Sequence, residues 1–275
     1  MSFERFRVQT FIESELGCTE IKKWPSYKAK FEALIISNQQ NATLNHMLIE
    51  DAQDLFYKGL LSLTEALLEV HQGKHSWATV KLYYSMFYFL KSSLAAKGYA
   101  LLRNGSLYLL HIKPGMAPEK KASNRGGRYC NDHVGVISIY EDIVGENDIL
   151  RTNNIDDQNV YEWLMTKRNI IHYNQRSFLE PEYADFFHYA RDAVANSKFS
   201  ELIDVYINDK LPIYCFDPDH ACIAAPVRRA LLTKKDLIHT GISTFAEDKL
   251  SIYKDMLKDV LTPTSSLWNL YSGDA

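Results

Sequence analysis

Apolar residues recur at spacings of three and four along two neighbouring stretches of the chain, which is typical of helices that bury one face. The first stretch begins near Asn41 and ends at Gln72-Gly73, and the second runs from Ser76, a favourable N-cap residue, to about Lys97-Gly98. Because the connection between them is short, we expect an antiparallel helical hairpin. The buried stripe of the second helix is expected to comprise Trp77, Val80, Tyr84, Phe87, Leu90 and Leu94.

The pattern then changes from a helical period to that of strands. Two short apolar segments, 99–102 and 107–112, flank the sequence Arg103-Asn104-Gly105-Ser106. Asn-Gly is a strong signal for a tight hairpin turn, since both residues tolerate positive φ. A small β-hairpin is therefore predicted after the helical pair.

The remaining segments are mostly helical in pattern. We expect a helix from Asp156 or Asp157, as cap residues, to Tyr173, and a long helix over 182–207 with a break near Ser197. A short strand is expected at 211–216, and the tail 262–275 is expected to lack a helix. Further helices are expected around Pro25, at 133–144, at 234–237 and at 244–261, while 221–232 stays ambiguous.

These elements predict an all-α protein, a helical bundle with a small inserted β-hairpin and a C-terminal helical extension. We place a domain boundary near residue 210, which gives a bundle over 1–210 and an extension over 211–275. The hydrophobic content of 46% and the charged content of 24% suit a folded domain rather than a disordered chain.

The first residues carry charge at Glu4, Arg5 and Arg7 and lack an apolar core, so we expect no signal peptide. The longest apolar run, 83–90, is too short to cross a bilayer. Four cysteines are widely spaced, which favours free thiols in a reducing compartment. These features predict a cytoplasmic protein without membrane attachment.

One concentrated basic stretch lies in a chain of net charge −3. Residues 113–132 combine prolines and glycines with Lys120, Lys121, Arg125 and Arg128. A solvated loop is one interpretation, and contact of these four cations with RNA or DNA is the other.

Arg168, Asn169 and His172 form the most promising chemical pattern. Arg168 and His172 are four residues apart, so a helix places both on one face. A fixed cation beside an imidazole can bind phosphate and transfer a proton. Alternatively, His172 lies near a helix C-terminus, where a cation is favourable, and Arg168 makes a surface ion pair.

The helix with Tyr83-Tyr84 resembles the Tyr-Tyr helix of the HEPN superfamily, and Arg168-Asn169…His172 is similar to that family's Arg-polar-x-His signature. The resemblance covers about residues 45–205. It implies a helical bundle, often dimeric, found among toxins and phage-defence proteins. Active members are metal-independent ribonucleases, in which the Arg stabilises the developing phosphorane charge and the His transfers a proton.

Only three residues separate Arg168 from His172, fewer than in the usual family spacing, and Lys167 is a poor substitute for a bidentate guanidinium. The sequence therefore favours a non-catalytic accessory or assembly subunit of a prokaryotic antiviral defence complex, for example the middle component of an ABC-ATPase three-component system. Such a subunit has protein partners and needs no cofactor. The alternative is an endoribonuclease toxin or effector in which Arg168 and His172 catalyse and Asn169 assists.

Cys215, His220 and Cys222 offer three zinc-type ligands within a short segment. Their spacing matches no recognised zinc pattern, and no fourth ligand lies nearby, so we expect no metal; a zinc-stabilised interaction protein is the third alternative. The chain has no GxxxxGK[ST], GxGxxG after a strand, HExxH or GxSxG pattern. Nucleotide hydrolysis by this chain is therefore not expected.

Overall fold

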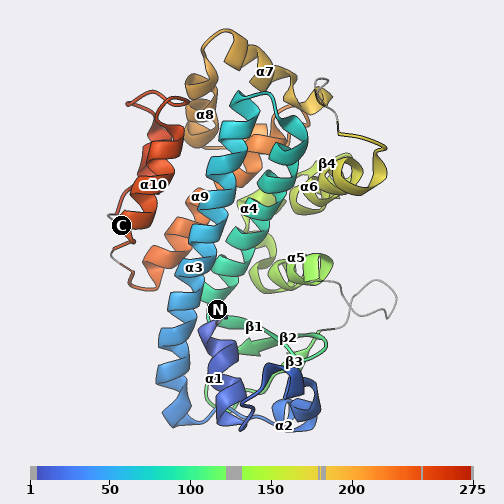
Figure 1. Ribbon diagram of the computed structural model, residues 1–275, viewed down its shortest axis with the longest axis vertical. Coiled ribbons are helices and arrows are strands. Elements are labelled where there is room, and N and C mark those ends of the chain that lie inside the picture. The colour runs from blue at the N-terminus through green and yellow to red at the C-terminus, as the bar shows by residue number, and fades with distance from the viewer. Residues whose placement is uncertain (1–4, 122–131, 179, 181–183, 243, 274–275) are drawn as a thin grey trace. The chain divides into compact units, whose positions relative to one another are not determined.

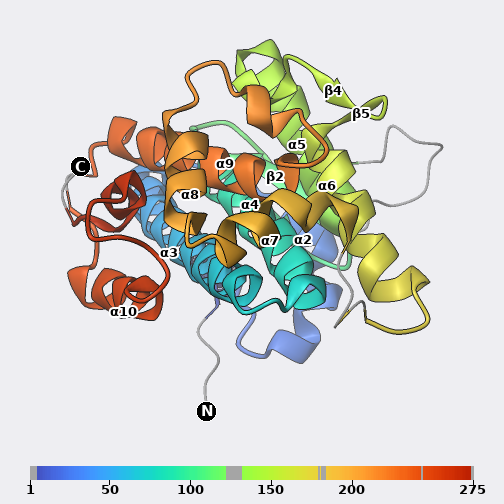
Figure 2. The ribbon, with the colours of Figure 1, turned by 90° about the horizontal axis from the view of Figure 1, so that it is seen from above.

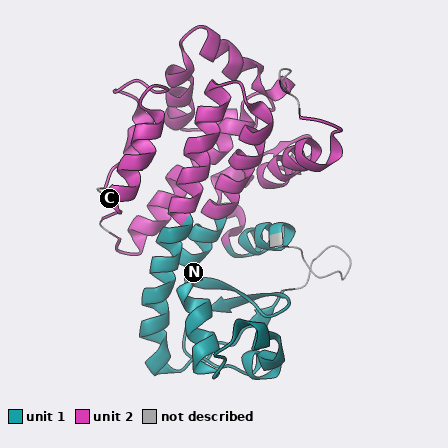
Figure 3. Ribbon diagram, in the orientation of Figure 1, with its two compact units in different colours: residues 1–55, 90–143 teal, residues 56–89, 144–275 magenta. Residues whose placement is uncertain are grey.

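A computed structural model describes residues 5–121, 132–178, 180, 184–242 and 244–273. They fall into two compact units, Met1–Leu55 with Leu90–Ile143 and Phe56–Phe89 with Val144–Ala275 (Figure 3). The boundary expected near residue 210 lies inside the second unit. The described residues are mainly helical with two small sheets, which confirms the predicted all-α bundle with its β-hairpin.

Two long helices form the predicted hairpin and run through both units. Helix α3 spans Asn38–His71 and helix α4 spans His75–Ala96 (Figure 1). Gly73 has φ of 74°, and the amides of Gly73 and Lys74 donate to the carbonyls of Val70 and Glu69. These bonds end α3 at a glycine in the left-handed conformation. Any residue with a side chain would be strained in that backbone conformation.

The first unit contains α1 (Arg7–Glu15), α2 (Lys28–Glu32) and most of α5 (Asp132–Val144) beside a three-stranded sheet. Its strands are ordered β1-β2-β3, and β1 pairs antiparallel with β2 across the expected turn at Gly105. The strands span Tyr99–Arg103, Leu107–His111 and Glu119–Lys120.

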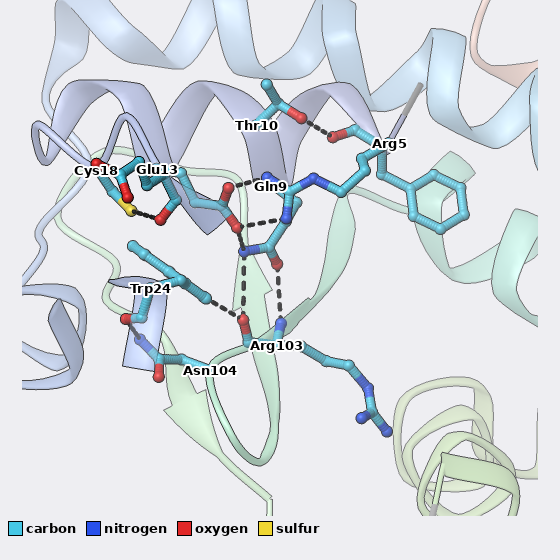
Figure 4. Close-up of polar contacts among 10 residues, drawn as sticks. Arg5, Gln9, Thr10, Glu13, Cys18, Trp24, Arg103 and Asn104 are labelled. Atoms are coloured by element: carbon cyan, nitrogen blue, oxygen red, sulfur yellow. Dashed lines mark hydrogen bonds and ion pairs between the residues drawn. The ribbon is translucent and has the colours of Figure 1, made fainter. Parts of the chain in front are cut away.

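Side chains of the N-terminal segment close the turn end of β1. The Gln9 amide donates to the Arg103 carbonyl and accepts from the Arg103 amide, as a neighbouring strand would (Figure 4). Trp24 Nε1 donates to the same carbonyl over 2.6 Å, and Asn104 Nδ2 donates to the Trp24 carbonyl. The buried Glu13 pairs with Arg5 close to this network. These bonds satisfy backbone groups that a strand end would otherwise leave unpaired.

The second unit surrounds its part of the hairpin with shorter helices. Figure 2 shows α8 and α9 side by side among them. The α-helices are α6 (Val160–Asn169), α7 (His188–Ala195), α8 (Phe199–Asn208), α9 (Ala221–His239) and α10 (Glu247–Leu257). Two short strands, β4 (Asn154–Ile155) and β5 (Gln158–Asn159), precede α6. Short 3-10 helices lie at Gly145–Asn147, Ile149–Arg151, Asp185–Phe187, Ile213–Cys215 and Ser266–Tyr271.

Several predicted element bounds need correction. The N-cap of α6 is Asn159, because Asp156 and Asp157 have φ of 51° and 61° and form the turn between β4 and β5. The expected strand at 211–216 is instead a 3-10 turn, and 221–239 is one continuous helix that includes Pro226. The expected break near Ser197 is confirmed, since this residue has φ of 57° between α7 and α8.

The C-terminal tail was expected to lack a helix but forms a 3-10 helix over Ser266–Tyr271, which is anchored by the buried side chains of Leu267, Leu270 and Tyr271. The Tyr271 hydroxyl lies 2.9 Å from Thr64 Oγ1, and Lys234 Nζ donates to the carbonyls of Asn269 and Ser272. In the described part of the chain, every helix is too short or too polar to cross a bilayer.

Candidate functional site

Helix α6 and the turn after it carry all three residues of the Arg168–His172 pattern. The Asn159 side chain caps the helix by accepting from the amides of Tyr161 and Glu162, each over 3.1 Å. The helix ends at Asn169, and the chain continues as a π-helical turn over Ile170–Asn174. Turns of this kind interrupt the α-helical period and are frequent at functional sites. The regular helix on which the sequence argument relied therefore ends before His172.

Arg168 lies almost completely inside the second unit, with 5% of its surface exposed. Its Nη2 donates to the hydroxyl of Tyr84 over 2.8 Å, and its Nη1 donates to Asn169 Oδ1 over 2.9 Å. The guanidinium carbon is 4.7 Å from the ring centre of Tyr173 and 5.6 Å from that of Tyr83. Among the described residues no carboxylate forms an ion pair with it, and its Nε is buried without a hydrogen-bond partner. The surface ion pair expected as the alternative is therefore not seen in the described part of the chain.

Tyr83 and Tyr84 are the tyrosines that the sequence pattern singled out, and the structure places both against Arg168. Burial raises the pKa of Tyr83 well above that of a free phenol, and the charge of Arg168 only partly opposes this rise. Tyr83 therefore stays a neutral phenol at physiological pH. Neutral phenol rings stabilise a guanidinium through cation–π contact without supplying a counter-charge.

His172 belongs to the same cluster but makes different contacts. Its ring centre lies 4.4 Å from that of Tyr173 and 5.8 Å from that of Trp77 on α4. Its Nδ1 is buried and has no hydrogen-bond partner among the described groups. Tyr173 therefore contacts both Arg168 and His172, whereas the Asn169 side chain bonds to Arg168 rather than to the imidazole.

Sequence reasoning missed the aromatic surface beside this cluster. Trp77, expected in the buried stripe of α4, is 45% exposed, and Phe178 is 43% exposed with its ring 5.3 Å from Trp77. Tyr173 and Ile170 are also exposed, at 63% and 38%. We call Trp77, Ile170, Tyr173 and Phe178 the aromatic patch. His75 and Ser76 before it and Ala78 after it are buried, so Trp77 is a single exposed position within a buried stretch, and no signal in the sequence marks it.

The predicted basic contact residues belong partly to the first unit. Lys120 lies on β3, and Lys121 Nζ lies 2.8 Å from Glu119 Oε1. Arg125 and Arg128 lie outside the described residues. The contact of Lys121 with Glu119 does not identify a nucleic-acid site.

Cys215, His220 and Cys222 form no metal centre in the described structure, where no group of three His, Cys, Asp or Glu residues is arranged for a metal ion. Both thiols are buried and free, and burial raises the pKa of each to about 12. His220 Nδ1 lies 2.8 Å from the Tyr206 hydroxyl, and its ring stacks on Tyr189. The zinc alternative therefore has no ligand set among these residues.

Comparison with known proteins identifies no relative: no family model, no curated protein and no solved structure matches the chain.

Proposed function

We propose that the chain is a non-catalytic HEPN-like accessory or assembly subunit of a prokaryotic antiviral defence complex, such as the middle component of an ABC-ATPase three-component system. The observation that carries this proposal is the burial of Arg168, whose two terminal nitrogens already bond to Tyr84 and Asn169. An arginine that stabilises a phosphorane must reach the phosphate oxygens with those nitrogens. Here the guanidinium instead joins α6 to α4.

The assembly role is supported by the aromatic patch next to that joint. Large aromatic side chains together with arginine are enriched in the energetically dominant part of protein interfaces. The defence context comes from the resemblance of residues 45–205 to HEPN proteins. We place the subunit in the cytoplasm because its first residues are charged and its cysteines are widely spaced.

One observation favours the ribonuclease alternative. Arg168 Nε and His172 Nδ1 are both buried polar atoms without a partner among the described groups. Such atoms in a folded protein call for an explanation, and a bound ligand is one. In this alternative a phosphate binds at Arg168 with help from Asn169, and His172 moves the proton of the ribose 2′-hydroxyl.

Cleavage and assembly assays on the same variants separate the two functions. Wild type, His172→Ala and the control His46→Ala are purified and incubated with total RNA, and growth is followed during expression. His46 is a suitable control because its side chain is 78% exposed. We expect no cleavage or growth arrest by any of the three.

The same proteins are co-expressed with the products of the adjacent genes, and we expect a complex of fixed stoichiometry that all three variants form. RNA cleavage that His172→Ala abolishes and His46→Ala retains would establish the ribonuclease instead. The subunit proposal fails if wild type forms no complex.

A further inference from the structure

The aromatic patch is continuous rather than a set of isolated exposed residues. Phe178 packs its edge against Trp77, Trp77 contacts His172, and His172 contacts Tyr173. Single apolar residues on a surface need no explanation, but contiguous ones mark interaction sites. Trp77, Phe178 and Tyr173, linked through the ring of His172, form such a surface, and Ile170 is exposed on the same segment.

Both sides of the patch are held in place by buried or half-buried groups. Tyr173 rests on the Arg168 guanidinium at 4.7 Å. Glu180 accepts from the amide and hydroxyl of Ser76, over 2.6 and 2.7 Å, next to Trp77. A surface ordered before binding loses less conformational entropy when a partner docks.

The charges around the patch favour an acidic partner. Of the Lys and Arg residues in the segment 163–179, Lys167 lies 4.0 Å from Asp156 and Arg168 is buried, which leaves Arg176 as the exposed one. Arg176 is exposed and forms no ion pair among the described residues. Glu180 is bonded to Ser76, so one exposed guanidinium near apolar rings remains, and this is complementary to a carboxylate flanked by apolar side chains.

The charge of the whole second unit distinguishes a protein partner from a nucleic acid. Residues 56–89 and 144–275 hold 17 Lys and Arg against 22 Asp and Glu, a net charge of −5. A nucleic-acid strand is attracted by many cations spread along its path, whereas this unit repels a polyanion beyond the patch. A short protein segment with one carboxylate can bind through the single local cation, Arg176.

We propose that the aromatic patch docks a partner protein through a segment in which an acidic residue is flanked by apolar side chains. The carboxylate pairs with Arg176, and the apolar groups pack on Trp77 and Phe178. This inference rests on the proposed assembly function and names the surface and the kind of partner that this function uses.

Peptide selection tests the proposal directly. A library of random peptides displayed on phage is selected against the full chain, and the peptides recovered are synthesised and titrated by fluorescence anisotropy. We expect them to share an acidic residue between apolar ones. Trp77→Ala and Phe178→Ala should each weaken binding about tenfold or more, as central aromatic contacts do. Ile252→Ala is the matched control, since Ile252 is 60% exposed elsewhere in the unit and should leave binding unchanged.

A charge exchange tests the ion pair. Arg176→Glu should weaken the selected peptide, and a peptide with Lys in place of its acidic residue should recover binding to that variant. Arg176 is exposed, so this variant is expected to keep the fold, which circular dichroism verifies.

The proposal is overturned if no acidic peptides are enriched or if they bind the patch variants as tightly as wild type. It is equally overturned if labelled single-stranded oligo(U) RNA binds the patch instead. Self-association in ultracentrifugation that Trp77→Ala abolishes would assign the patch to a second copy of the chain. If the patch variants still form the complex with co-expressed partners, this surface is wrong while the assembly function stands.

Discussion

The hydroxyl of Tyr84 accepts a hydrogen bond of 2.8 Å from Arg168 Nη2, and this bond connects the middle of α4 to the end of α6. It joins the two segments that the sequence pattern singled out separately. Because the donor is charged and nearly buried, the bond belongs to the stronger class of protein hydrogen bonds. The pair therefore ties the candidate site to the stability of the second unit.

We predict that Tyr84→Phe lowers the free energy of unfolding by roughly 1.5–3 kcal/mol, because a buried cation loses a hydrogen-bond partner. Arg168→Ala should cost at least as much, since Asn169 and Tyr173 also lose their contacts. Urea unfolding measures both. Arg176→Ala is the control and should change stability by no more than about 0.5 kcal/mol. If the losses in free energy of unfolding for Tyr84→Phe and Arg168→Ala simply add in the double variant, the two residues do not interact.

A second prediction concerns the buried ion pair of α9. Arg229 Nη1 lies 3.6 Å from Asp148 Oδ2, and both side chains are at most 3% exposed. Asp148 also accepts from the Tyr161 hydroxyl, and Arg229 also pairs with Asp236. Removal of one partner leaves the other charge buried, so Asp148→Ala should destabilise the fold by roughly 3–5 kcal/mol.

Thermal unfolding of Asp148→Ala beside Glu146→Ala measures this effect, with Glu146 as the exposed neighbour. A loss below about 1 kcal/mol would mean that Asp236 alone is a sufficient counter-ion for Arg229.

The long helices and the β-hairpin could be predicted because their apolar periods and turn residues agree with their positions in the fold. The α3–α4 hairpin has a sustained apolar period and a glycine at its turn, and the β-hairpin has Asn-Gly at its own. The start of α6 could not be placed in the same way. Asp156 and Asp157 suit a helix cap, but Asn159 is also a good cap and follows the β4–β5 turn. Local sequence does not rank adjacent caps, since the tertiary contacts of the turn decide between them.

The candidate site was only partly predictable for a similar reason. Spacing placed Arg168 and His172 on one helical face, but the π-helical turn and the burial of Arg168 depend on contacts with α4. Trp77 fits the apolar period of α4 and nevertheless lies at the surface. Periodicity records which face is apolar and not which positions on that face another element covers.

A third prediction concerns pH. Burial lowers the pKa of His220, mainly through loss of hydration, although Asp217 and Asp219 oppose the shift. The folded state therefore binds protons less readily than the unfolded chain, so unfolding becomes easier as pH falls below about 6.5. His75 and His111 are shifted in the same direction, also mainly by burial.

Urea unfolding at pH 7.5 and 5.5 should show lower stability at the acidic pH, and His220→Gln should reduce the difference between them. Proton NMR of the His220 ring should give a midpoint below 6.5. A midpoint at or above that value would contradict the expected sign.

A final prediction tests the close approach of α3 and α4. A Cβ added at Gly59 would lie 2.5 Å from Cε1 of Phe89, a ring with no exposed surface. Alanine favours a helix by about 1 kcal/mol over glycine, but insertion of a methyl group into a packed core costs about 1–3 kcal/mol. We expect overpacking to prevail because Phe89 is fully buried and its ring also contacts Phe56. Gly59→Ala should therefore lower the midpoint of thermal unfolding, and Phe89→Leu in the same chain should recover part of the loss. Stabilisation by Gly59→Ala alone would show that the ring yields easily and that the glycine is not required for helix packing.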